Sequence, residues 1–498
     1  MRNITVKGLR KAFAGRIVLS NVDFALSEES RLALVGENGA GKSTLLRILS
    51  RQLEPDAGEM YGLENGCAYV AQDFSGDPNQ TPEQFLASRI KDVRRALPLL
   101  EQSGFDLGKD GEKLRNCKCG DLSGGEQKKL EIIAGLVRGS LFLALDEPEN
   151  HLDYLTIEWL IRSLKKFKGG LVFVSHDQYL IDELADSILE LEEGSVVTYS
   201  MRYDEYLAEK ERQVAGEARQ WMMEKKTIHR LRETVAMMKL RASRSSDTAA
   251  TYRQTKRRLQ RLEEEHDSKR PTAEQDKPRV RLGTVEQKRG KQIVVVEHLD
   301  FSYGAHVIFR DANADLRFGE KVVLFGRNGS GKSTLVRLLI GELHPQHGVA
   351  RIGVNIRWQM MSQDHLEGIN PEASSLQVFR ESLGWPEARS RATLAKYGIS
   401  AQLVNRPLQV LSGGQRARFK LALTFAHDPE FLILDEPTNH VDPTTWEAIV
   451  EAIQGYSGTV LAITHDRMFI DAIASSLWLL ENRKIQAYPG NVSDYLKR

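Results

Sequence analysis

The stretch GENGAGKST at Gly36–Thr44 returns as GRNGSGKST at Gly326–Thr334, 290 residues further along the chain. Both copies fit the pattern G-x-x-x-x-G-K-[ST], in which glycines let backbone N–H groups converge on phosphate groups at the start of a helix. Each copy follows a short apolar run and precedes a helix-like stretch, LLRILS or LVRLLI. The sequence therefore predicts two phosphate-binding domains of one kind.

Other short motifs recur at almost the same interval. The aromatic residues Phe13 and Tyr303 lie 290 residues apart, and the glutamines Gln72 and Gln363 lie 291 apart. The motifs LSGGEQ and LSGGQR, the two LDEP runs and the two HD pairs recur at 289. An ordered series that repeats with so little drift indicates an internal duplication rather than chance matches.

The two phosphate loops carry the groups that a nucleotide with Mg²⁺ requires. Lys42 and Lys332 are expected to reach the β- and γ-phosphates, and the hydroxyls of Ser43 and Ser333 to hold Mg²⁺. The loop residues expected to bind ATP are Gly36, Asn38, Gly39, Gly41, Lys42, Ser43 and Thr44 in the first copy, and Gly326, Asn328, Gly329, Gly331, Lys332, Ser333 and Thr334 in the second.

Paired acids follow an apolar run in each half. Asp146 ends LFLALD and Asp435 ends FLILD, so each places a carboxylate at a strand terminus, where it supports Mg²⁺. Glu147 and Glu436 come next and are the natural groups to polarise an attacking water. The sequence thus predicts one metal-binding and one catalytic carboxylate in each half.

Two further motifs keep a fixed distance from these acids. His176 and His465 each lie 29 residues after the glutamate of their own half, which favours a γ-phosphate contact over a plain core histidine. A Ser-Gly-Gly sequence lies 23 residues before each metal-binding aspartate. Its hydroxyl, bare backbone N–H groups and helix dipole suit an anion. These residues are Ser123, Gly124, Gly125, Ser412, Gly413 and Gly414.

The bulk composition indicates a soluble globular protein. The chain has 498 residues, more than one hydrophobic core usually supports, with 41% hydrophobic and 28% charged residues. It has no run of 18 apolar residues, and its start, MRNITVKGLRKAF, lacks the apolar segment of a secretory signal. Its three cysteines provide no disulfide framework. We expect a cytoplasmic protein without a transmembrane segment.

In both halves, short β-branched runs alternate with helical patterns, as in a largely parallel sheet with helices on its faces. We expect an α/β fold with two tandem P-loop ATPase domains, at residues 1–200 and 293–498. The linker at 201–292 has a different pattern, because its apolar residues recur every seven positions. A helix with a narrow apolar seam is predicted, formed by Val214, Trp221, Ile228 and Val235.

The rest of the linker completes a helical hairpin. A polar stretch at 241–250 is the expected turn, and 251–266 is the expected returning helix. From residue 225 to residue 261 there are twelve basic and two acidic residues, whereas the whole chain has a net charge of +1.

A basic segment on an otherwise acidic protein indicates a phosphate-rich partner, most naturally nucleic acid. A solvated spacer is the alternative, although the charge gathers toward the tip. The expected RNA-binding residues are Arg241, Arg244, Arg253, Lys256, Arg257 and Arg258.

The order of these motifs resembles that of the ATP-binding cassette superfamily. Each half contains, in this order, a phosphate loop, a glutamine loop, an LSGG motif, a DEP motif and a histidine. The subgroup that the chain resembles is ABC-F, whose paired cassettes act on ribosomes. That resemblance rests on EPENHLD at Glu147–Asp153, EPTNHVD at Glu436–Asp442, the segment YPGNVSDYL and the charged hairpin. It covers essentially the whole chain and implies ATP and Mg²⁺ as cofactors.

The resemblance also implies a head-to-tail clamp within a monomer, with two shared sites that both hydrolyse ATP. Each phosphate loop would face the Ser-Gly-Gly motif of the other half, and Gln72 and Gln363 would join the catalytic groups. Phe13 and Tyr303 would stack on adenine, unless they are core aromatics. Glu149, where the family has threonine, adds an acid beside the first site. The hairpin would enter the ribosomal E site, near rRNA and tRNA, and point toward the peptidyl-transferase centre.

Two alternatives stay open. The energy subunit of a membrane transporter also carries fused cassettes, although it usually lacks a basic hairpin. Within ABC-F, a translation factor for stalled ribosomes competes with an antibiotic-resistance factor. The arm that many family members insert in the first cassette is missing or minimal here, since Gln72 and Ser123 lie 51 residues apart and Gln363 and Ser412 lie 49 apart. A missing arm favours resistance, whereas a compact hairpin tip favours the translation factor.

Overall fold

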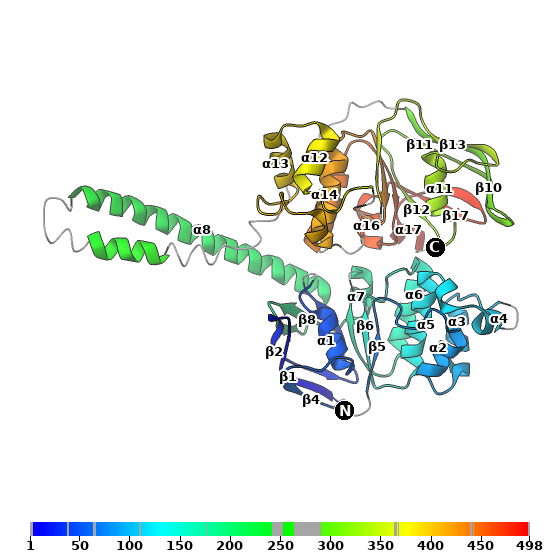
Figure 1. Ribbon diagram of the computed structural model, residues 1–498, viewed down its shortest axis with the longest axis horizontal. Helices are drawn as coiled ribbons and strands as arrows, with labels where there is room; N and C mark the ends of the chain where they lie inside the picture. The colour runs from blue at the N-terminus through cyan, green and yellow to red at the C-terminus, as the bar shows by residue number, and fades with distance from the viewer. Residues whose placement is uncertain are drawn as a thin grey trace. The chain divides into compact units, whose positions relative to one another are not determined.

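The computed structural model describes residues 3–36, 39–62, 66–108, 111–175, 177–241, 252–262, 290–362, 366, 368–438, 441 and 443–496. Two units emerge from the contacts within the chain. One comprises Met1–Tyr203 and Val280–Arg498, and the other comprises Asp204–Arg279. The first unit contains both α/β domains, and the second contains the helical linker (Figure 1).

A six-stranded sheet forms the centre of the first domain, with the strand order β5-β6-β7-β3-β8-β9. Five strands run parallel, and β9 pairs antiparallel with β8 at one edge. Side chains of β5, β6 and β7 are buried along the whole strand, which explains their continuous apolar sequences. The strands are β3 (Arg31–Val35), β5 (Cys67–Val70), β6 (Phe142–Asp146), β7 (Gly170–Val174), β8 (Ser187–Glu192) and β9 (Ser195–Tyr199).

A smaller antiparallel sheet, absent from our sequence-based expectations, lies beside the central one. Its order is β2-β1-β4, formed by β1 (Asn3–Phe13), β2 (Arg16–Ser27) and β4 (Ala57–Tyr61). Burial alternates along the second half of β2, so one face is apolar and the other is exposed. The apolar face packs in one core cluster with the helix α1 and with strands of the central sheet.

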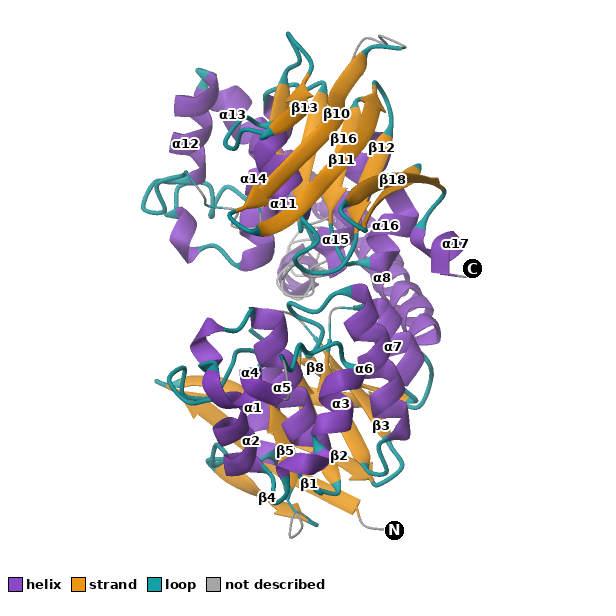
Figure 2. Ribbon diagram, turned by 90° about the vertical axis from the view of Figure 1, so that its right-hand side faces the viewer, coloured by secondary structure: helices purple, strands orange, loops and turns teal. Residues whose placement is uncertain are grey.

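Helices flank the central sheet of the first domain, and Figure 2 shows how helices and strands form separate layers in each domain. They are α1 (Lys42–Leu49), α2 (Pro82–Arg89), α3 (Leu97–Gln102), α4 (Glu112–Asn116), α5 (Gly124–Val137), α6 (Tyr154–Lys166) and α7 (Gln178–Leu184), with 3-10 turns η1 (Val93–Arg95) and η3 (Cys119–Asp121).

The second domain repeats this architecture. Its sheets have the orders β14-β15-β16-β12-β17-β18 and β11-β10-β13. The strands are β10 (Gln292–Tyr303), β11 (His306–Arg317), β12 (Lys321–Phe325), β13 (His347–Ile352), β14 (Trp358–Met361), β15 (Phe431–Asp435), β16 (Thr459–Ile463), β17 (Ser476–Glu481) and β18 (Lys484–Pro489). The helices are α11 (Lys332–Leu339), α12 (Ser375–Leu383), α13 (Glu387–Lys396), α14 (Gly413–Ala426), α15 (Pro443–Gly455), α16 (Arg467–Ile473) and α17 (Val492–Leu496), with a 3-10 turn η4 (Leu408–Val410).

The linker unit is helical, as predicted from its seven-residue repeat. A single helix, α8, spans Tyr203–Arg241, and residues 252–262 form a second helix that runs beside it (Figure 1). Trp221 and Ile228 of the predicted seam are buried, as is Leu259 of the second helix. Of the predicted turn at 241–250, residue 241 is the last residue of α8, and residues 242–250 lie outside the described residues. The fold class, two tandem P-loop α/β domains with a helical linker, is confirmed.

Among the described residues, no helix combines the length and the apolar character needed to cross a bilayer.

Candidate nucleotide-binding sites

Each predicted phosphate loop joins a central strand to the helix that follows it. Gly41 precedes α1 with a φ of 110°, and Gly331 precedes α11 with a φ of 102°. A Cβ atom at Gly41 would lie 2.5 Å from Cγ1 of Val18, and one at Gly331 would lie 2.5 Å from Cγ2 of Ile308. Only glycine therefore fits these two positions, on account of both the backbone angle and the space.

The loop lysines turn back into their own loops. Lys42 Nζ donates a hydrogen bond of 2.7 Å to the carbonyl of Gly36. Lys332 Nζ donates to the carbonyls of Gly326 (2.9 Å) and Arg327 (3.1 Å). Both side chains are buried, and burial lowers the pKa of Lys332 although acidic groups nearby oppose the shift. Each loop thus holds a buried ammonium group among backbone atoms at the start of a helix, as phosphate binding requires.

The carboxylate of Asp146 lies at the end of β6 among hydroxyl groups. Its Oδ2 accepts a 2.9 Å hydrogen bond from Tyr69, and a hydrogen bond from Ser43 also acts on it. Burial raises the pKa of Asp146, while the two hydroxyls and Lys128 oppose that shift. The structure therefore brings Ser43 and Asp146 together, and hard oxygen ligands of this kind suit Mg²⁺. Asp435 ends β15 in the same manner.

Glu147 is held in a fixed orientation. Its backbone is left-handed, with a φ of 46°, and its Oε2 accepts hydrogen bonds from Gln72 Nε2 (2.8 Å) and Asn150 Nδ2 (2.7 Å). The predicted glutamine and glutamate of the first half are thus in direct contact. Strained backbone of this kind clusters at functional sites.

The second half places the corresponding glutamate beside the histidine. Glu436 also has a left-handed backbone, with a φ of 49°, and its Oε1 lies 4.0 Å from His465 Nε2. Burial, together with the charge of Asp435, raises the pKa of Glu436 to about 8. Burial and the neighbouring Lys332 lower the pKa of His465 to about 3, so this imidazole is neutral at pH 7. Among the predicted ligands, Asn38, His176 and Gln363 lie outside the described residues.

The two Ser-Gly-Gly motifs begin α5 and α14. Ser123 accepts a hydrogen bond from the backbone of Glu126, whose side chain bonds back to Ser123, and Ser412 and Gln415 form the same reciprocal pair. Such capping boxes satisfy free N–H groups of the first turn. The glycines add no side chains of their own at these two helix starts.

The two aromatic residues expected near adenine are not core residues. Phe13 and Tyr303, each at the end of the first strand of its domain, are both 47% exposed. Their rings are accessible to a planar base in both domains. This exposure excludes the alternative interpretation that Phe13 and Tyr303 are core aromatic residues.

Residues of the two domains meet at the second phosphate loop. The backbone N–H of Asn328 donates to Asp153 Oδ2 (3.1 Å), and its side-chain amide donates to the carbonyl of His151 (2.9 Å). A Cβ atom at Gly125 would lie 3.5 Å from the same Asn328 amide. The phosphate loop of the second domain therefore lies against the Ser-Gly-Gly helix of the first.

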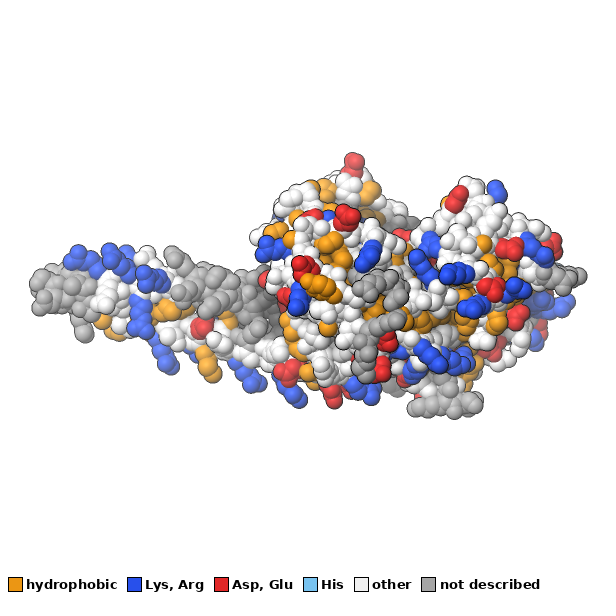
Figure 3. Space-filling model, turned by 90° about the horizontal axis from the view of Figure 1, so that it is seen from below, with side chains coloured by type: hydrophobic (Ala, Val, Ile, Leu, Met, Phe, Trp, Pro, Cys, Tyr) orange, Lys and Arg blue, Asp and Glu red, His pale blue; other side chains and the backbone are white. Residues whose placement is uncertain are grey.

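The linker presents four of its six predicted RNA-binding residues to solvent. Arg253, Lys256, Arg257 and Arg258 are exposed on the helix at 252–262, and Figure 3 shows Lys and Arg side chains along the linker with few acids between them. Arg244 and the side chain of Arg241 lie outside the described residues.

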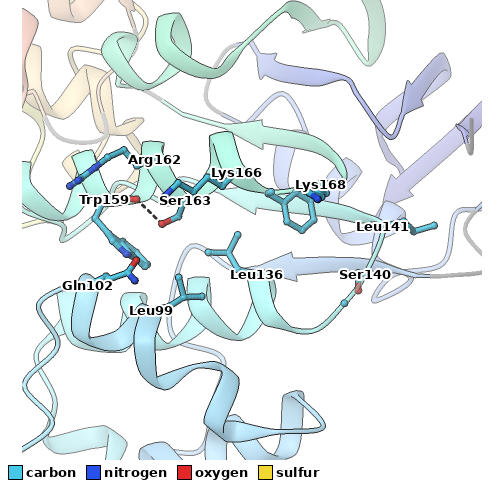
Figure 4. Close-up of a pocket in the computed structure, with 12 residues that line it drawn as sticks. Leu99, Gln102, Leu136, Ser140, Leu141, Trp159, Arg162, Ser163, Lys166 and Lys168 are labelled. Atoms are coloured by element: carbon cyan, nitrogen blue, oxygen red, sulfur yellow. Dashed lines mark hydrogen bonds between the residues drawn. The ribbon is translucent and has the colours of Figure 1, made fainter.

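A surface cavity of about 750 Å³ lies elsewhere in the first domain, among α3, α5 and α6 (Figure 4). Its lining includes Leu99, Trp159, Arg162 and Lys166, and it contains none of the predicted nucleotide ligands. This cavity therefore does not coincide with the nucleotide sites that the sequence motifs predict.

Sequence patterns missed two side chains that touch the first site. Tyr69 donates to Asp146, and Lys128 donates to backbone carbonyls of the same site. Both residues lie outside the repeated motifs, because the equivalent positions in the second half hold Met360 and Ala417. In the sequence, these two residues could have been found only by comparing the two repeats, which differ at these positions next to the shared motifs.

The fold and these loops define a tandem ATP-binding-cassette protein. A family model described as ABC transporter matches residues 19–150 and 309–439, and a second model with the same description matches residues 189–282. Together they span both cassettes and the linker. The chain belongs to the ABC-F family of ATP-binding-cassette proteins.

Similar curated proteins extend over nearly the whole chain. ABC transporter F family member 5 of Arabidopsis thaliana is 29% identical over 99% of this chain and 77% of its own length. The energy-dependent translational throttle protein EttA of Mycobacterium tuberculosis is 29% identical over 94% of this chain and 89% of its own. ATP-binding protein Uup of Escherichia coli is 29% identical over 99% of this chain and 83% of its own.

A solved structure supports the fold. The archaeal ribosome recycling factor aABCE1, in complex with the ribosomal stalk protein aP1, gives a TM-score of 0.66 with 20% sequence identity, over 99% of this chain and 91% of that chain. The cassettes bind ATP, and their motifs imply ATPase activity.

Proposed function

We propose that this protein is an ATP-hydrolysing ABC-F protein that acts on the ribosome. The observation that carries the proposal is the combination of two complete sets of nucleotide motifs with an exposed basic linker helix. The relative named as a translational throttle supports the link with translation. Cytoplasmic location and a monomeric chain, with its two cassettes acting as an internal dimer, belong to the same proposal.

Two composite sites would bind two ATP molecules. The second phosphate loop would face Ser123–Gly125, and the contacts of Asn328 with Asp153 and His151 support that pairing. The first phosphate loop would face Ser412–Gly414. In each site, the helix start of the opposite cassette would donate N–H groups to the γ-phosphate.

The residues of each site divide the chemistry of hydrolysis among themselves. Lys42 and Lys332 would bind the phosphate charge, while Glu147 and Glu436 would orient and polarise the attacking water. The histidines and glutamines would position the γ-phosphate and that water.

Hard oxygen ligands complete each site. Ser43 with Asp146, and Ser333 with Asp435, would hold Mg²⁺, which when bound neutralises charge on the phosphates. Closure on ATP and opening after hydrolysis would drive a change on the ribosome.

The linker would supply the ribosomal contact. Its exposed basic residues suit RNA phosphates, and we propose that the hairpin enters the E site near tRNA and points toward the peptidyl-transferase centre. Two roles fit this position, rescue of stalled ribosomes and displacement of antibiotics. The energy subunit of a membrane transporter remains the second candidate function, favoured only by the cassettes themselves.

Co-sedimentation with ribosomes tests the proposal. The double variant Glu147→Gln/Glu436→Gln should retain ATP without turnover and pellet with ribosomes in an ATP-dependent manner. Wild-type protein should pellet less, because hydrolysis releases it. If the double variant stays in the supernatant at low salt with ATP present, the ribosome is not its target.

Charge reversal on the linker tests the RNA contact. Four exposed basic residues are changed to glutamate, and the matched control reverses four exposed basic residues of the first cassette. Ribosome affinity should fall and lose most of its salt dependence in the linker variant alone, with ATPase activity retained. Equal losses in both variants would contradict a linker-specific contact. The linker set is Arg253, Lys256, Arg257 and Arg258, and the control set is Lys118, Arg162, Lys166 and Lys168.

A further inference from the structure

A buried lysine connects three backbone segments of the first cassette. Lys128 lies in α5, five residues after Ser123, and is only 4% exposed. Its Nζ donates hydrogen bonds to the carbonyls of Ala71 (2.7 Å), Gln72 (3.1 Å) and Asp146 (3.2 Å). An ammonium group has three protons to donate, so this geometry uses all of them.

The three carbonyls belong to the segments that carry the catalytic groups. Ala71 and Gln72 follow β5, and the Gln72 side chain donates to Glu147. Asp146 ends the neighbouring strand β6 and directly precedes Glu147. One ammonium group therefore fixes the backbone on both sides of the contact between the glutamine and the glutamate.

Acids around Lys128 offset the cost of burying its charge. Burial lowers the pKa of Lys128, and the largest opposing influence comes from Glu149, followed by Glu131. Glu149 is itself held in place, because its Oε1 accepts a 2.7 Å hydrogen bond from Ser175. A buried ammonium without nearby acids would be far more costly.

The second cassette lacks both charges. Ala417 occupies the place of Lys128, five residues after Ser412, and Thr438 occupies the place of Glu149, two residues after Glu436. Both of these residues are buried. The positive and the negative charge therefore occur together in one repeat and are missing together from the other.

We propose that Lys128 is a positioning residue for hydrolysis in the first site, with Glu149 as its countercharge. The inference rests on the ATPase activity within the proposed function and is independent of the ribosomal target. Lys128 holds the backbone of Gln72 and Asp146 so that Glu147 faces the reacting phosphate, and the second site works without this device.

A double-mutant cycle on ATP hydrolysis tests the proposal. All variants are made in a Glu436→Gln background, which silences the second site so that kcat reports the first site alone. There Lys128→Met should lower kcat roughly tenfold, because loss of alignment affects the chemical step, with the KM for ATP changed less than about threefold. Lys128→Arg should restore part of the activity. The double variant Lys128→Ala/Glu149→Thr copies the second cassette and should recover most of kcat. Its loss of kcat should therefore be smaller than the product of the losses in the single variants Lys128→Ala and Glu149→Thr.

Each outcome bears on the proposal. An unchanged kcat in Lys128→Met, a loss confined to KM, or multiplying losses in the double variant would overturn it. If Lys128→Met does not fold, the Lys128→Ala/Glu149→Thr variant still decides, because its activity must exceed that of Lys128→Ala alone. Absence of ATPase activity in the wild-type protein would instead refute the proposed function, and failed ribosome binding with intact ATPase activity would leave this inference standing.

Discussion

Replacing Glu436 by glutamine should stabilise the nucleotide-free protein at neutral and alkaline pH. Burial and the charge of Asp435 raise the pKa of Glu436 from 4.5 to about 8, and Lys332 offsets only part of that shift. The folded protein then keeps a proton that the unfolded chain releases. The contribution of Glu436 to stability is therefore greatest below pH 4.5 and falls as the pH rises toward about 8. Glutamine has no such proton, so the variant should lack this loss.

The size of the effect follows from the shift. One unit of pKa difference corresponds to about 1.4 kcal/mol. Between about pH 5 and about pH 7.5, the wild type should lose roughly 3 kcal/mol of unfolding free energy relative to the variant. For a domain of this size, that difference corresponds to roughly 6–12 °C in Tm.

Scanning calorimetry in EDTA, without nucleotide, measures this difference at pH 5, 6, 7 and 8. The matched control is Glu447→Gln, which removes an exposed carboxylate from α15. The Tm of Glu436→Gln should exceed that of the wild type by an amount that grows with pH, while the control follows the wild type. A difference between variant and wild type that stays constant with pH, or has the opposite sign at pH 7, would refute the reasoning.

Three further substitutions have definite expected outcomes. Gly331→Ala should abolish nucleotide binding by the second cassette, because its Cβ would lie 2.5 Å from Ile308, and titration with a fluorescent ATP analogue should give one bound nucleotide in place of two. Tyr303→Ala should raise the KM for ATP about tenfold with little change in kcat, since base stacking is worth about 1–3 kcal/mol. Arg467→Ala breaks a 2.9 Å ion pair between the buried Arg467 and the partly exposed Glu158 and should cost roughly 1–3 kcal/mol in unfolding free energy, a loss that calorimetry detects as a lower Tm and that Glu158→Ala should partly reverse.

The parts of the site that could be predicted from sequence depend on local rules. A phosphate loop needs glycine at Gly41 and Gly331 because of backbone angle and space, and those requirements appear as a short motif. The aspartate at the end of a buried strand, such as Asp146, is equally local. The apolar repeat of the linker likewise predicted α8, since a seven-residue period has one geometric meaning.

The parts of the site and the fold that were not predicted depend on chain segments that meet only after folding. Lys128 stands in the sequence EQKKL, where it has the appearance of an ordinary exposed helix residue. Lys128 is buried because α5 packs beside the ends of β5 and β6. The carbonyl groups that Lys128 contacts there lie 56 or more residues before it in the sequence and 18 residues after it. Tyr69 meets Asp146 in the same way, across 77 residues. The small antiparallel sheet escaped prediction partly for the same reason, because β4 pairs with β1 at long range, although β1 and β2 form a local hairpin.

The two nucleotide sites are chemically unequal although their backbones repeat. In the first, Glu147 accepts hydrogen bonds from Gln72 and Asn150, and a buried lysine and an additional acid stand nearby. In the second, the buried Glu436 has a raised pKa and a neutral histidine beside it. A water-polarising carboxylate must be ionised to act, so the second site needs added positive charge before its glutamate can serve as a base. The positive charge of a bound metal ion would add to that of Lys332 there, whereas the first site contains a second buried lysine, Lys128, in addition to Lys42. Hydrolysis at the second site should therefore depend more steeply on pH and on Mg²⁺ concentration than hydrolysis at the first.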